Sequence, residues 1–228
     1  MAIVFPAWLA VGFTLERSAG FLRFALLSSV FLLLTLAPWT TRNLIVMGSP
    51  IWGRDNFGLE LRTSNNDCAG PAFSNSMRSG CHNATHPNVN ADEARKVREI
   101  GEVAYNRQQL HDVLGWIRSN PGRFAQLSFD RFLLFWFPQL RAPANPFPLW
   151  TISALGFAGA ILAFRANRMA GLLLGASLVC YSIPYYFVQH ILRYRYPILW
   201  VSFFLAAYAL DRGWTFFRSI STRLRSAA

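Results

Sequence analysis

The chain has 228 residues, of which 53% are hydrophobic, 15% are aromatic and only 14% are charged. Soluble domains average about 25% charged residues, and this composition excludes a disordered chain, a collagen-like repeat and a disulfide-dense miniprotein. Uncharged stretches cover residues 24–41, 142–164 and 169–192. A bilayer span needs about 20 mostly apolar residues, so the sequence predicts an integral membrane protein.

The net charge is +11, from 22 basic and 11 acidic residues. A basic excess is also found in nucleic-acid-binding proteins, but there it forms a patch or stripe. Here residues 40–125 are close to charge balance, and most of the other basic residues flank the apolar stretches. Arginines beside spans are the usual orientation signal of membrane proteins. We therefore expect no nucleic-acid partner.

The N-terminal segments predict one partial span and one complete span, within residues 1–41. Residues 1–15 are apolar but short, and no basic region precedes them as it would in a signal peptide. We interpret them as a partial span, either the tail of a span whose beginning is absent or a truncated one. Residues 24–41 form the first complete span, and Arg17 and Arg23 before it indicate a cytoplasmic start.

An outer loop is predicted for residues 42–141. Residues 42–90 are rich in Gly, Asn, Ser and Pro, which is typical of an irregular or short-stranded segment. Apolar residues then recur at helical spacing, which predicts a helix over about 91–119 that Gly101 weakens. Asn90 followed by Glu93 resembles a capping box at the start of this helix.

The segment from about residue 121 to 137 is apolar and aromatic but contains Arg123, Asp130 and Arg131. If this segment crossed the membrane, every later loop would lie on the opposite side from the one that the arginines indicate. We therefore predict an amphipathic helix on the outer membrane surface. Pro121 fits the first position of such a helix.

Three further transmembrane helices are predicted within residues 142–213, followed by a basic cytoplasmic tail over 214–228. The spans cover about 145–164, 169–189 and 197–213. Arg165 and Arg168 lie in a very short loop that we place in the cytoplasm. The predicted fold is thus mainly α and polytopic, with about four full transmembrane helices, a partial N-terminal one, and one large outer loop.

Cys68 and Cys81 both lie in the predicted outer loop. An oxidising compartment permits a disulfide between them, which is the interpretation we favour. Free thiols and a metal site with His82 and His86 are the alternatives, although the spacing matches no standard zinc pattern. We predict no metal site in this chain. Cys180 lies within a span and is interpreted as a packing residue.

The run from His190 to Pro197 is the strongest candidate for chemistry. It contains Arg193 and Arg195 in a very short outer loop, against the usual orientation preference. Arginine matches phosphate geometry with paired hydrogen bonds, so we interpret this pair as anion-binding. Pairing with loop carboxylates or lipid headgroups is the alternative. Tyr194 and Tyr196 are predicted interface anchors.

A second candidate is the end of the first span, where Trp39 is a predicted interface anchor and Arg42 is another outward cation. Simple anchoring explains both residues equally well. Carboxylates of the outer loop are interpreted as solvated, because nothing in the sequence shows a perturbing partner, and a role for one of them as a base or a metal ligand is the alternative. The residues concerned are Asp55, Glu60 and Asp67.

In the motifs around the candidate arginines and in the segments between them, the chain resembles GT-C glycosyltransferases. It resembles more closely the bacterial relatives of protein O-mannosyltransferases and lipid A aminoarabinose transferases. The resemblance covers nearly the whole chain and rests on the order of several loose motifs. They are Pro38-Trp39-Thr40-Thr41-Arg42-Asn43, then Gly48, Asp55-Asn56-Phe57-Gly58-Leu59, Ser64-Asn65-Asn66, His86-Pro87-Asn88, Gly101-Glu102-Val103-Ala104-Tyr105-Asn106-Arg107, Asn120-Pro121-Gly122-Arg123-Phe124, Phe135-Trp136-Phe137-Pro138 and Arg193-Tyr194-Arg195-Tyr196-Pro197.

The resemblance implies a bacterial inner-membrane enzyme that moves a sugar from a polyprenyl-phosphate carrier to an acceptor on the outer face. Its catalytic acidic residue lies in an outer loop that precedes the region this chain matches. We therefore assign no catalytic residue and expect the chain alone to be inactive. Arg42, Arg193 and Arg195 inherit a possible carrier-phosphate role. An N-terminal half or partner subunit, and a divalent metal in the complete enzyme, are further implications.

The alternative function is a membrane protein without enzymatic activity, such as an accessory subunit that binds anionic lipid. It would use the same arginines as headgroup contacts. Loss of polyprenyl-phosphate binding on replacement of Arg193 and Arg195 separates a binder from a scaffold.

Overall fold

Helices account for the regular secondary structure in the computed structural model, which describes residues 3–16, 18–139 and 145–226. The described part contains no strand, only an isolated β-bridge between Ala72 and His190. The predicted mainly α class is therefore confirmed. Arg17, which the orientation argument uses, and the predicted boundary at residues 141–142 lie outside the described residues.

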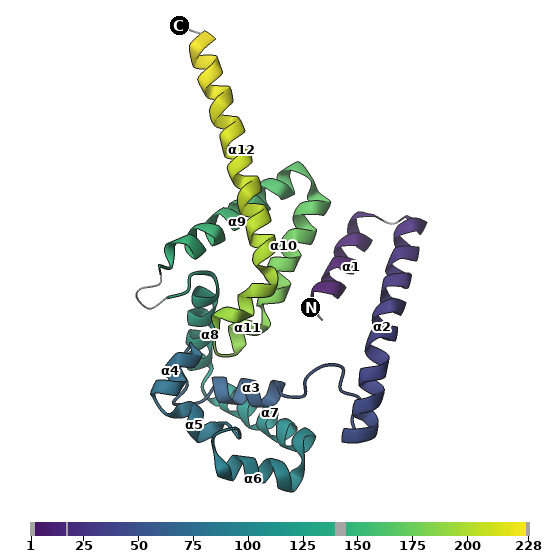
Figure 1. Cartoon of the computed structure of the whole chain (residues 1–228), viewed down its shortest axis with the longest axis vertical. Coiled ribbons are helices and arrows are strands. Elements are labelled where there is room, and N and C mark those ends of the chain that lie inside the picture. The colour runs from purple at the N-terminus through teal and green to yellow at the C-terminus, as the bar shows by residue number, and fades with distance from the viewer. Residues whose placement is uncertain (1–2, 17, 140–144, 227–228) are drawn as a thin grey trace. The chain divides into compact units, whose positions relative to one another are not determined.

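Figure 1 shows the helices along the chain. In chain order they are α1 (Val4–Leu15), α2 (Ala19–Met47), α3 (Phe57–Ser64), α4 (Phe73–Arg78), α5 (Cys81–Thr85), α6 (Ala91–Ile100), α7 (Glu102–Ser119), α8 (Pro121–Trp136), α9 (Phe147–Ala166), α10 (Arg168–Ser182), α11 (Pro184–Phe187), the 3₁₀ helix η1 (Leu192–Ile198) and α12 (Leu199–Ser226).

Three of the described helices are long and apolar enough to cross a membrane: Ala19–Met47, Phe147–Ala166 and Arg168–Phe187, the last including α11. α2 carries the highest mean hydropathy, 2.0, and buries only Ala25 and Asn43. A helix that exposes so much apolar surface is stable only in an apolar environment. The first half of α12 coincides with the predicted span at 197–213, but α12 is not among these three.

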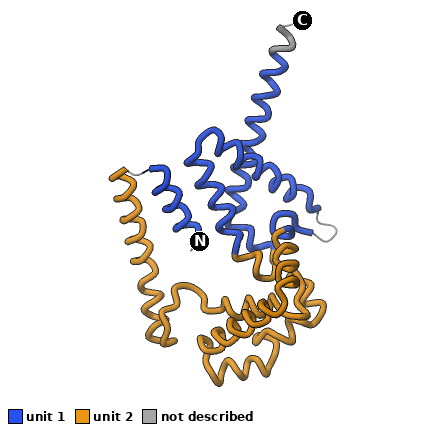
Figure 2. The backbone as a smooth tube through the Cα atoms, turned by 180° about the vertical axis from the view of Figure 1, so that it is seen from behind, with its two compact units in different colours: residues 1–17, 133–183, 192–228 blue, residues 18–132, 184–191 orange. Residues whose placement is uncertain are grey.

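The chain divides into two compact units (Figure 2). Unit 1 contains α1, the last turn of α8, α9, α10, η1 and α12. Unit 2 contains α2 to α7, most of α8, and α11 with the residues up to Ile191. Unit 1 therefore holds most of the apolar C-terminal helices, and unit 2 holds α2 together with the predicted outer segment as far as Phe132.

Unit 1 is a bundle in which small residues bring helices together. A Cβ atom on Gly159 of α9 would lie 1.9 Å from the carbonyl oxygen of Leu205 in α12. One turn earlier, a Cβ on Gly156 would be in ordinary contact with Ser202, 3.5 Å from its carbonyl oxygen. Glycine allows such close backbone approach, as is common between membrane helices. Leu205 and Val201 are accordingly buried.

α1 is joined to the same bundle through Trp8. Its indole Nε1 donates to the carbonyl oxygen of Leu173, at 3.1 Å, and to Oγ of Ser177, at 2.9 Å, both in α10. The helix has 12 residues, so it is shorter than a complete span. Its contact with α10 is consistent with the predicted partial span.

Unit 2 corrects the prediction for residues 42–90. α2 runs on to Met47 and ends at Gly48, which has a left-handed φ of 68°. Three short helices follow where we predicted an irregular or short-stranded segment. α3 packs tightly on α7, since a Cβ on Gly58 would lie 2.1 Å from the carbonyl oxygen of Asn106. Helices this short leave weak periodicity in a sequence. The prediction therefore rested on the Gly- and Asn-rich composition, and it was wrong.

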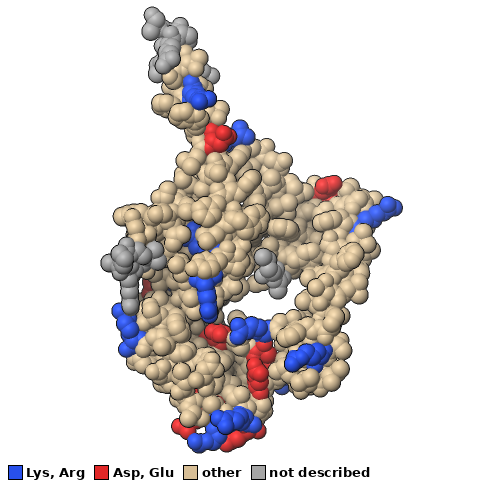
Figure 3. Space-filling model, viewed as in Figure 1, with Lys and Arg blue, Asp and Glu red and all other residues tan. Residues whose placement is uncertain are grey.

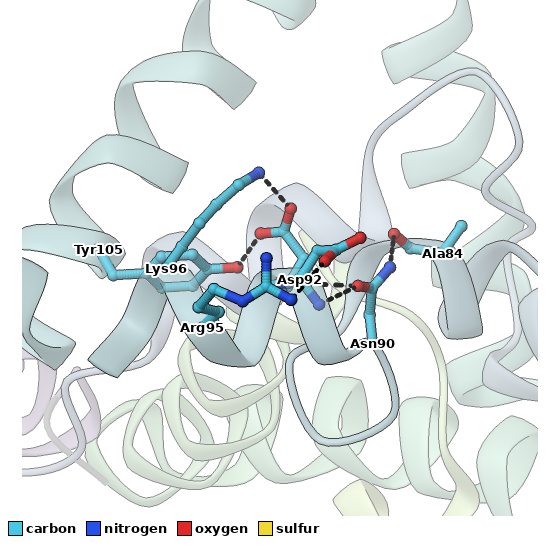
Figure 4. Close-up of polar contacts among 7 residues, drawn as sticks. Ala84, Asn90, Asp92, Arg95, Lys96 and Tyr105 are labelled. Atoms are coloured by element: carbon cyan, nitrogen blue, oxygen red, sulfur yellow. Dashed lines mark hydrogen bonds and ion pairs between the residues drawn. The ribbon is translucent and has the colours of Figure 1, made fainter. Parts of the chain in front are cut away.

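The helix predicted over 91–119 is two helices, α6 and α7, separated at Gly101 with φ of 83°. Asn90 accepts from the backbone N–H groups of Asp92 and Glu93, as a cap should. The Glu93 carboxylate does not complete the capping box with the backbone of Asn90. It accepts instead from Lys96 and from the Tyr105 hydroxyl of α7, each at 2.6 Å (Figure 4).

This contact fixes the corner between α6 and α7. Burial alone would raise the pKa of Glu93, but the hydrogen bonds from Lys96 and Tyr105 outweigh it and hold that pKa below its ordinary value. Burial and the same hydrogen bond raise the pKa of Tyr105. Glu93 therefore stays ionised and Tyr105 stays a donor at neutral pH.

α8 begins at Pro121, as predicted, but its faces are not those of the predicted surface helix. Leu127, Arg131 and Phe135, spaced one turn apart, are fully buried. Phe129 is 60% exposed. The cation thus lies on the buried side and an aromatic ring lies outside. The charges in this segment predicted an amphipathic helix, but the buried guanidinium of Arg131 does not mark its exposed face, because hydrogen bonds inside the protein compensate the burial.

We predict that Gly159→Ala destabilises unit 1. The added Cβ meets backbone that cannot rotate away, and overpacking of this kind costs roughly 1–3 kcal/mol. A lower thermal unfolding temperature in detergent is the expected result. Gly175→Ala in α10 is the matched control, because nothing lies within 4 Å of its added Cβ. Equal stability of the two variants would contradict the close packing of α9 and α12.

Candidate functional site

The end of α2 explains the residue pattern around Arg42. The Trp39 indole donates to the carbonyl oxygen of Gly53, at 3.2 Å, and the Asn43 amide donates to that of Ile51, at 2.9 Å. These two side chains are one turn apart, so together they hold the returning chain against the helix end. Arg42 lies between them in sequence and is exposed.

The exposed Arg42 guanidinium has two local contacts. Its Nη1 donates to Oδ1 of Asn43 at 2.9 Å, and its Cζ lies 5.3 Å from the centre of the Trp39 ring. The ring is 49% exposed. An aromatic ring beside a cation at the end of an apolar helix is typical of a membrane interface.

η1 places Arg193 and Arg195 in different surroundings. Arg193 is exposed, with its Cζ 5.9 Å from the centre of the Tyr194 ring. Arg195 is 1% exposed. Of the predicted anchors in this run, Tyr196 is 60% exposed and Tyr194 is half-buried. The two arginines therefore do not act as a pair.

Arg195 caps the C-terminal end of α8. Its guanidinium donates to the carbonyl oxygens of Trp136, at 3.0 Å, and Phe135, at 3.5 Å, and to Oγ of Ser153, at 2.7 Å. The last carbonyls of a helix have no partner within the helix and carry partial negative charge. The buried guanidinium of Arg195 donates hydrogen bonds to these carbonyls and compensates their partial negative charge. We therefore drop Arg195 from the candidate phosphate contacts.

The structure does not gather the three predicted arginines into one unit. Arg42 belongs to unit 2, whereas Arg193 and Arg195 belong to unit 1. Of the three, Arg42 and Arg193 are exposed. Each lies beside an aromatic ring.

The residue that sequence analysis missed is Arg131, which forms the centre of a buried polar cluster in unit 2. Its Nη1 donates to Oδ1 of Asn65, at 2.9 Å, and to the carbonyl oxygen of Phe187, at 3.1 Å. Its Nη2 donates to the carbonyl oxygen of Ser64. Burial, together with the charge of Arg123, lowers the pKa of Arg131 to about 10, so the group remains a cation at neutral pH.

The same cluster holds the segment between α11 and η1. Gln189 donates its amide to the carbonyl oxygen of Thr63, at 2.9 Å, and to Oγ of Ser76. Its backbone N–H donates to Oγ of Ser64, at 2.8 Å. His190 then exchanges backbone hydrogen bonds with residues 71 and 73. A segment late in the sequence is thereby fixed to the end of α3 and to α4.

A disulfide joins Cys68 and Cys81 and closes the loop that receives this segment. The loop includes Ser76 and the β-bridge residue Ala72. The alternatives of free thiols and of a metal bound to these cysteines therefore do not describe this structure. Cys180 is the free cysteine. Among the described residues, no three His, Cys, Asp or Glu side chains lie close enough to hold a metal ion.

The carboxylates of Asp55, Glu60 and Asp67 have structural partners. Asp55 accepts from the Asn106 amide at 2.9 Å, and Asn106 in turn accepts from the backbone N–H of Leu59. Glu60 accepts from Asn56, and Asp67 accepts from the Trp116 indole at 2.8 Å. Each carboxylate fixes a helix end or a loop to its neighbour. Nothing in this geometry favours a catalytic role for them.

One signal in the sequence could have identified the buried cluster. Arg131 interrupts an aromatic run at the same spacing as the buried residues Leu127 and Phe135. The polar run Ser64-Asn65-Asn66 offers amide and carbonyl acceptors without a charge. A cation at a buried position needs such acceptors. Which segment supplies them is a property of the fold and is not visible in the sequence.

Comparisons with family models, with curated proteins and with solved structures find no match to this chain.

We predict that Arg131→Lys destabilises unit 2 by about 2–3 kcal/mol, because one ammonium cannot reach three separated acceptors and leaves buried oxygens unpaired. Amide hydrogen exchange of residues 187–190 should become faster, and the unfolding temperature should fall. Arg118→Lys is the control, because Arg118 is exposed on α7. Unchanged exchange at 187–190 would show that Arg131 does not hold this segment.

We also predict that the double change Cys68→Ser and Cys81→Ser destabilises unit 2 by about 3 kcal/mol, the value expected for a loop of this size from chain entropy. Limited proteolysis should then cut within residues 69–80 sooner than in the parent protein. Cys180→Ser, which leaves the disulfide intact, should not change the cleavage rate. Equal rates in all three proteins would contradict a stabilising disulfide.

Proposed function

We propose that the chain is the membrane-embedded C-terminal part of a glycosyltransferase that moves a sugar from a polyprenyl-phosphate carrier to an acceptor on the outer face. The observation that best supports this is the exposed guanidinium of Arg193, in the short η1 connection between two apolar helices. The ion pairs of the described residues involve α6 and α7, and none includes Arg193 or Arg42.

The proposal places the outer segment of unit 2, from α3 to α8, outside the cytoplasm. Arg165 and Arg168, between α9 and α10, and the basic end of α12 then lie in the cytoplasm, in agreement with the orientation rule. The disulfide between Cys68 and Cys81 supports this orientation, because such bonds persist in oxidising compartments and are rare in the cytoplasm. In this arrangement the first half of α12 completes a fourth crossing.

Arg193 is then an outer-face arginine, against the usual preference for basic residues on the cytoplasmic side. Ionisable residues that persist at such positions commonly bind ions or substrates. A guanidinium donates two parallel hydrogen bonds to phosphate oxygens, which suits a lipid phosphate at the membrane surface. Arg42, at the outer end of α2, is the second proposed contact.

In the proposed transfer, an acceptor hydroxyl oxygen attacks the anomeric carbon of the sugar. The bond from that carbon to the carrier phosphate oxygen breaks, and the phosphate leaves with the electron pair. A cation beside the departing phosphate stabilises the charge that develops on it. The acceptor proton goes to a base outside this chain. Arg193 and Arg42 therefore bind the carrier phosphate and stabilise its developing charge, and the complete enzyme supplies the catalytic base.

The second candidate is a membrane protein without enzymatic activity that binds anionic lipid. It is favoured by one observation, that both exposed arginines lie against aromatic rings, at 5.3 Å from Trp39 and 5.9 Å from Tyr194. Such pairs also serve as general headgroup anchors. The two functions differ in selectivity, since an anchor accepts any anionic headgroup whereas a carrier site prefers polyprenyl phosphate.

We predict that Arg193→Gln weakens binding of polyprenyl phosphate about tenfold, because a charge-assisted hydrogen bond of roughly 1.5–3 kcal/mol is lost. Native mass spectrometry of the purified chain with added lipid measures the bound fraction. The matched control is Arg165→Gln, which removes an exposed arginine at the C-terminal end of α9.

Parallel measurements with phosphatidylglycerol separate the two candidates. Loss of polyprenyl-phosphate binding alone supports the transferase, and equal loss for both lipids supports the anionic-lipid protein. If Arg193→Gln binds both lipids as well as Arg165→Gln does, Arg193 has no phosphate role and the proposed site is wrong.

A further inference from the structure

The second half of α12, residues 211–226, is a helix without a packing surface in unit 1. The first half of α12 packs on α9 and buries Val201, Leu205 and Ala209. From Asp211 to Ile220 every residue is exposed. Figure 1 shows α12 continuing beyond α9 and α10 of the same unit. The large apolar side chains from Trp214 to Ile220 remain exposed.

The residues of this segment separate into two faces when they are projected at the 100° per residue of an α-helix. One half of the projection contains the large apolar residues, with Ser221 as its single polar member. The other half contains the charged residues and the threonines. For residues 211–222 the apolar set is Trp214, Phe216, Phe217 and Ile220, and the polar set is Asp211, Arg212, Thr215, Arg218, Ser219 and Thr222.

The apolar face is strongly exposed. Trp214 is 56% exposed, Phe216 is 68% exposed and Phe217 is 62% exposed. The rings of Trp214 and Phe217 stack with their centres 6.1 Å apart, so they form one continuous apolar surface. A contiguous exposed patch of aromatic residues indicates a binding surface.

The polar face is basic. Four arginines and one aspartate give residues 211–226 a net charge of +3, and Figure 3 shows basic side chains on this part of α12. The guanidinium carbons of Arg212 and Arg218 lie 5.0 Å from the ring centres of Tyr208 and Trp214. The cations thus border the aromatic surface, as they do in helices that lie in the membrane interface.

We propose that residues 211–226 form a membrane-surface helix that binds the anionic headgroups of the leaflet at which α12 ends. The apolar face enters the boundary of the acyl chains while the arginines contact lipid phosphates. Continuity with the apolar first half of α12 already places the segment at the bilayer surface. Gly213 lies at its start, where a glycine weakens the helix and lets it turn onto that surface.

A lipid surface fits this segment better than a second copy of the chain. A helix-to-helix contact requires a matching apolar face, and its borders are selected for paired opposite charges. The borders here are basic, and Asp211 is the only acidic residue of the segment. Two copies would therefore repel each other, whereas an anionic leaflet is complementary to this charge. The inference does not depend on the proposed transferase function.

The test uses the full chain carrying Cys180→Ser in lipid nanodiscs, with a nitroxide label at Phe217→Cys or at Ser219→Cys. These two positions lie on opposite faces of one helix turn. Collisions with oxygen, which dissolves in the bilayer, and with a water-soluble nickel complex report the depth of each label. Discs contain phosphatidylcholine alone or mixed with phosphatidylglycerol.

With phosphatidylglycerol we expect the label at 217 to be shielded from nickel and the label at 219 to remain accessible. Each arginine near an anionic surface contributes about a fivefold change in the membrane-binding constant. The double change Arg212→Gln and Arg218→Gln should therefore abolish most of the shielding. Arg95→Gln with Arg98→Gln, which removes two exposed arginines of α6, should leave it unchanged.

Three results would overturn the proposal. Equal nickel access at 217 and 219 would mean that the helix projects into water. Shielding at both positions would mean that protein covers the segment. The same pattern in phosphatidylcholine alone would mean that headgroup charge is not recognised.

Discussion

Two buried arginines hold the C-terminal ends of α3, α8 and α11, and neither has a carboxylate partner among the described residues. Arg131 donates to the last carbonyl of α3 and the last carbonyl of α11, and Arg195 donates to the last two carbonyls of α8. Helix C-termini carry unsatisfied oxygens and partial negative charge, and burying them without a partner is costly. A planar guanidinium reaches several such oxygens at once, which an ammonium cannot do. The segments that follow α3, α8 and α11 depend on these hydrogen bonds.

This arrangement divides the arginines of the chain by function. Of 22 basic residues only Lys96 is a lysine, and it lies on the exposed surface of α6. Buried arginines act on the protein backbone, whereas Arg42 and Arg193 face outward beside aromatic rings. The motif that contains Arg193 and Arg195 therefore combines a structural residue with a candidate binding residue. Replacing both together mixes loss of stability with loss of binding.

The apolar stretches predicted the three described helices that are long and apolar enough to cross a membrane, because length and hydropathy depend only on local sequence. The fourth predicted span, at 197–213, is not among them. Their ends were less accurate, since helices continue into polar residues until a cap stops them. Ser18 caps α2 at its start and Gly48 ends it, both outside the predicted span. The short helices α3 to α5 and the partners of Arg131 were not predictable, because these contacts join residues far apart in the sequence. Arg131 and Asn65 are 66 residues apart.

The hydrogen bonds of Gln189 have a consequence for the order in which the protein assembles. Its partners Ser64 and Ser76 are synthesised more than 100 residues earlier, before α9 and α10. Domains generally fold as units during synthesis, beginning from the N-terminus, but unit 2 lacks one of its own segments until two apolar helices have followed. The segment from α3 to α8 can close its disulfide early, yet it acquires its contacts with Gln189 only after α9 and α10 have been synthesised. Completion of unit 2 therefore depends on a segment that follows two helices of unit 1 in the chain.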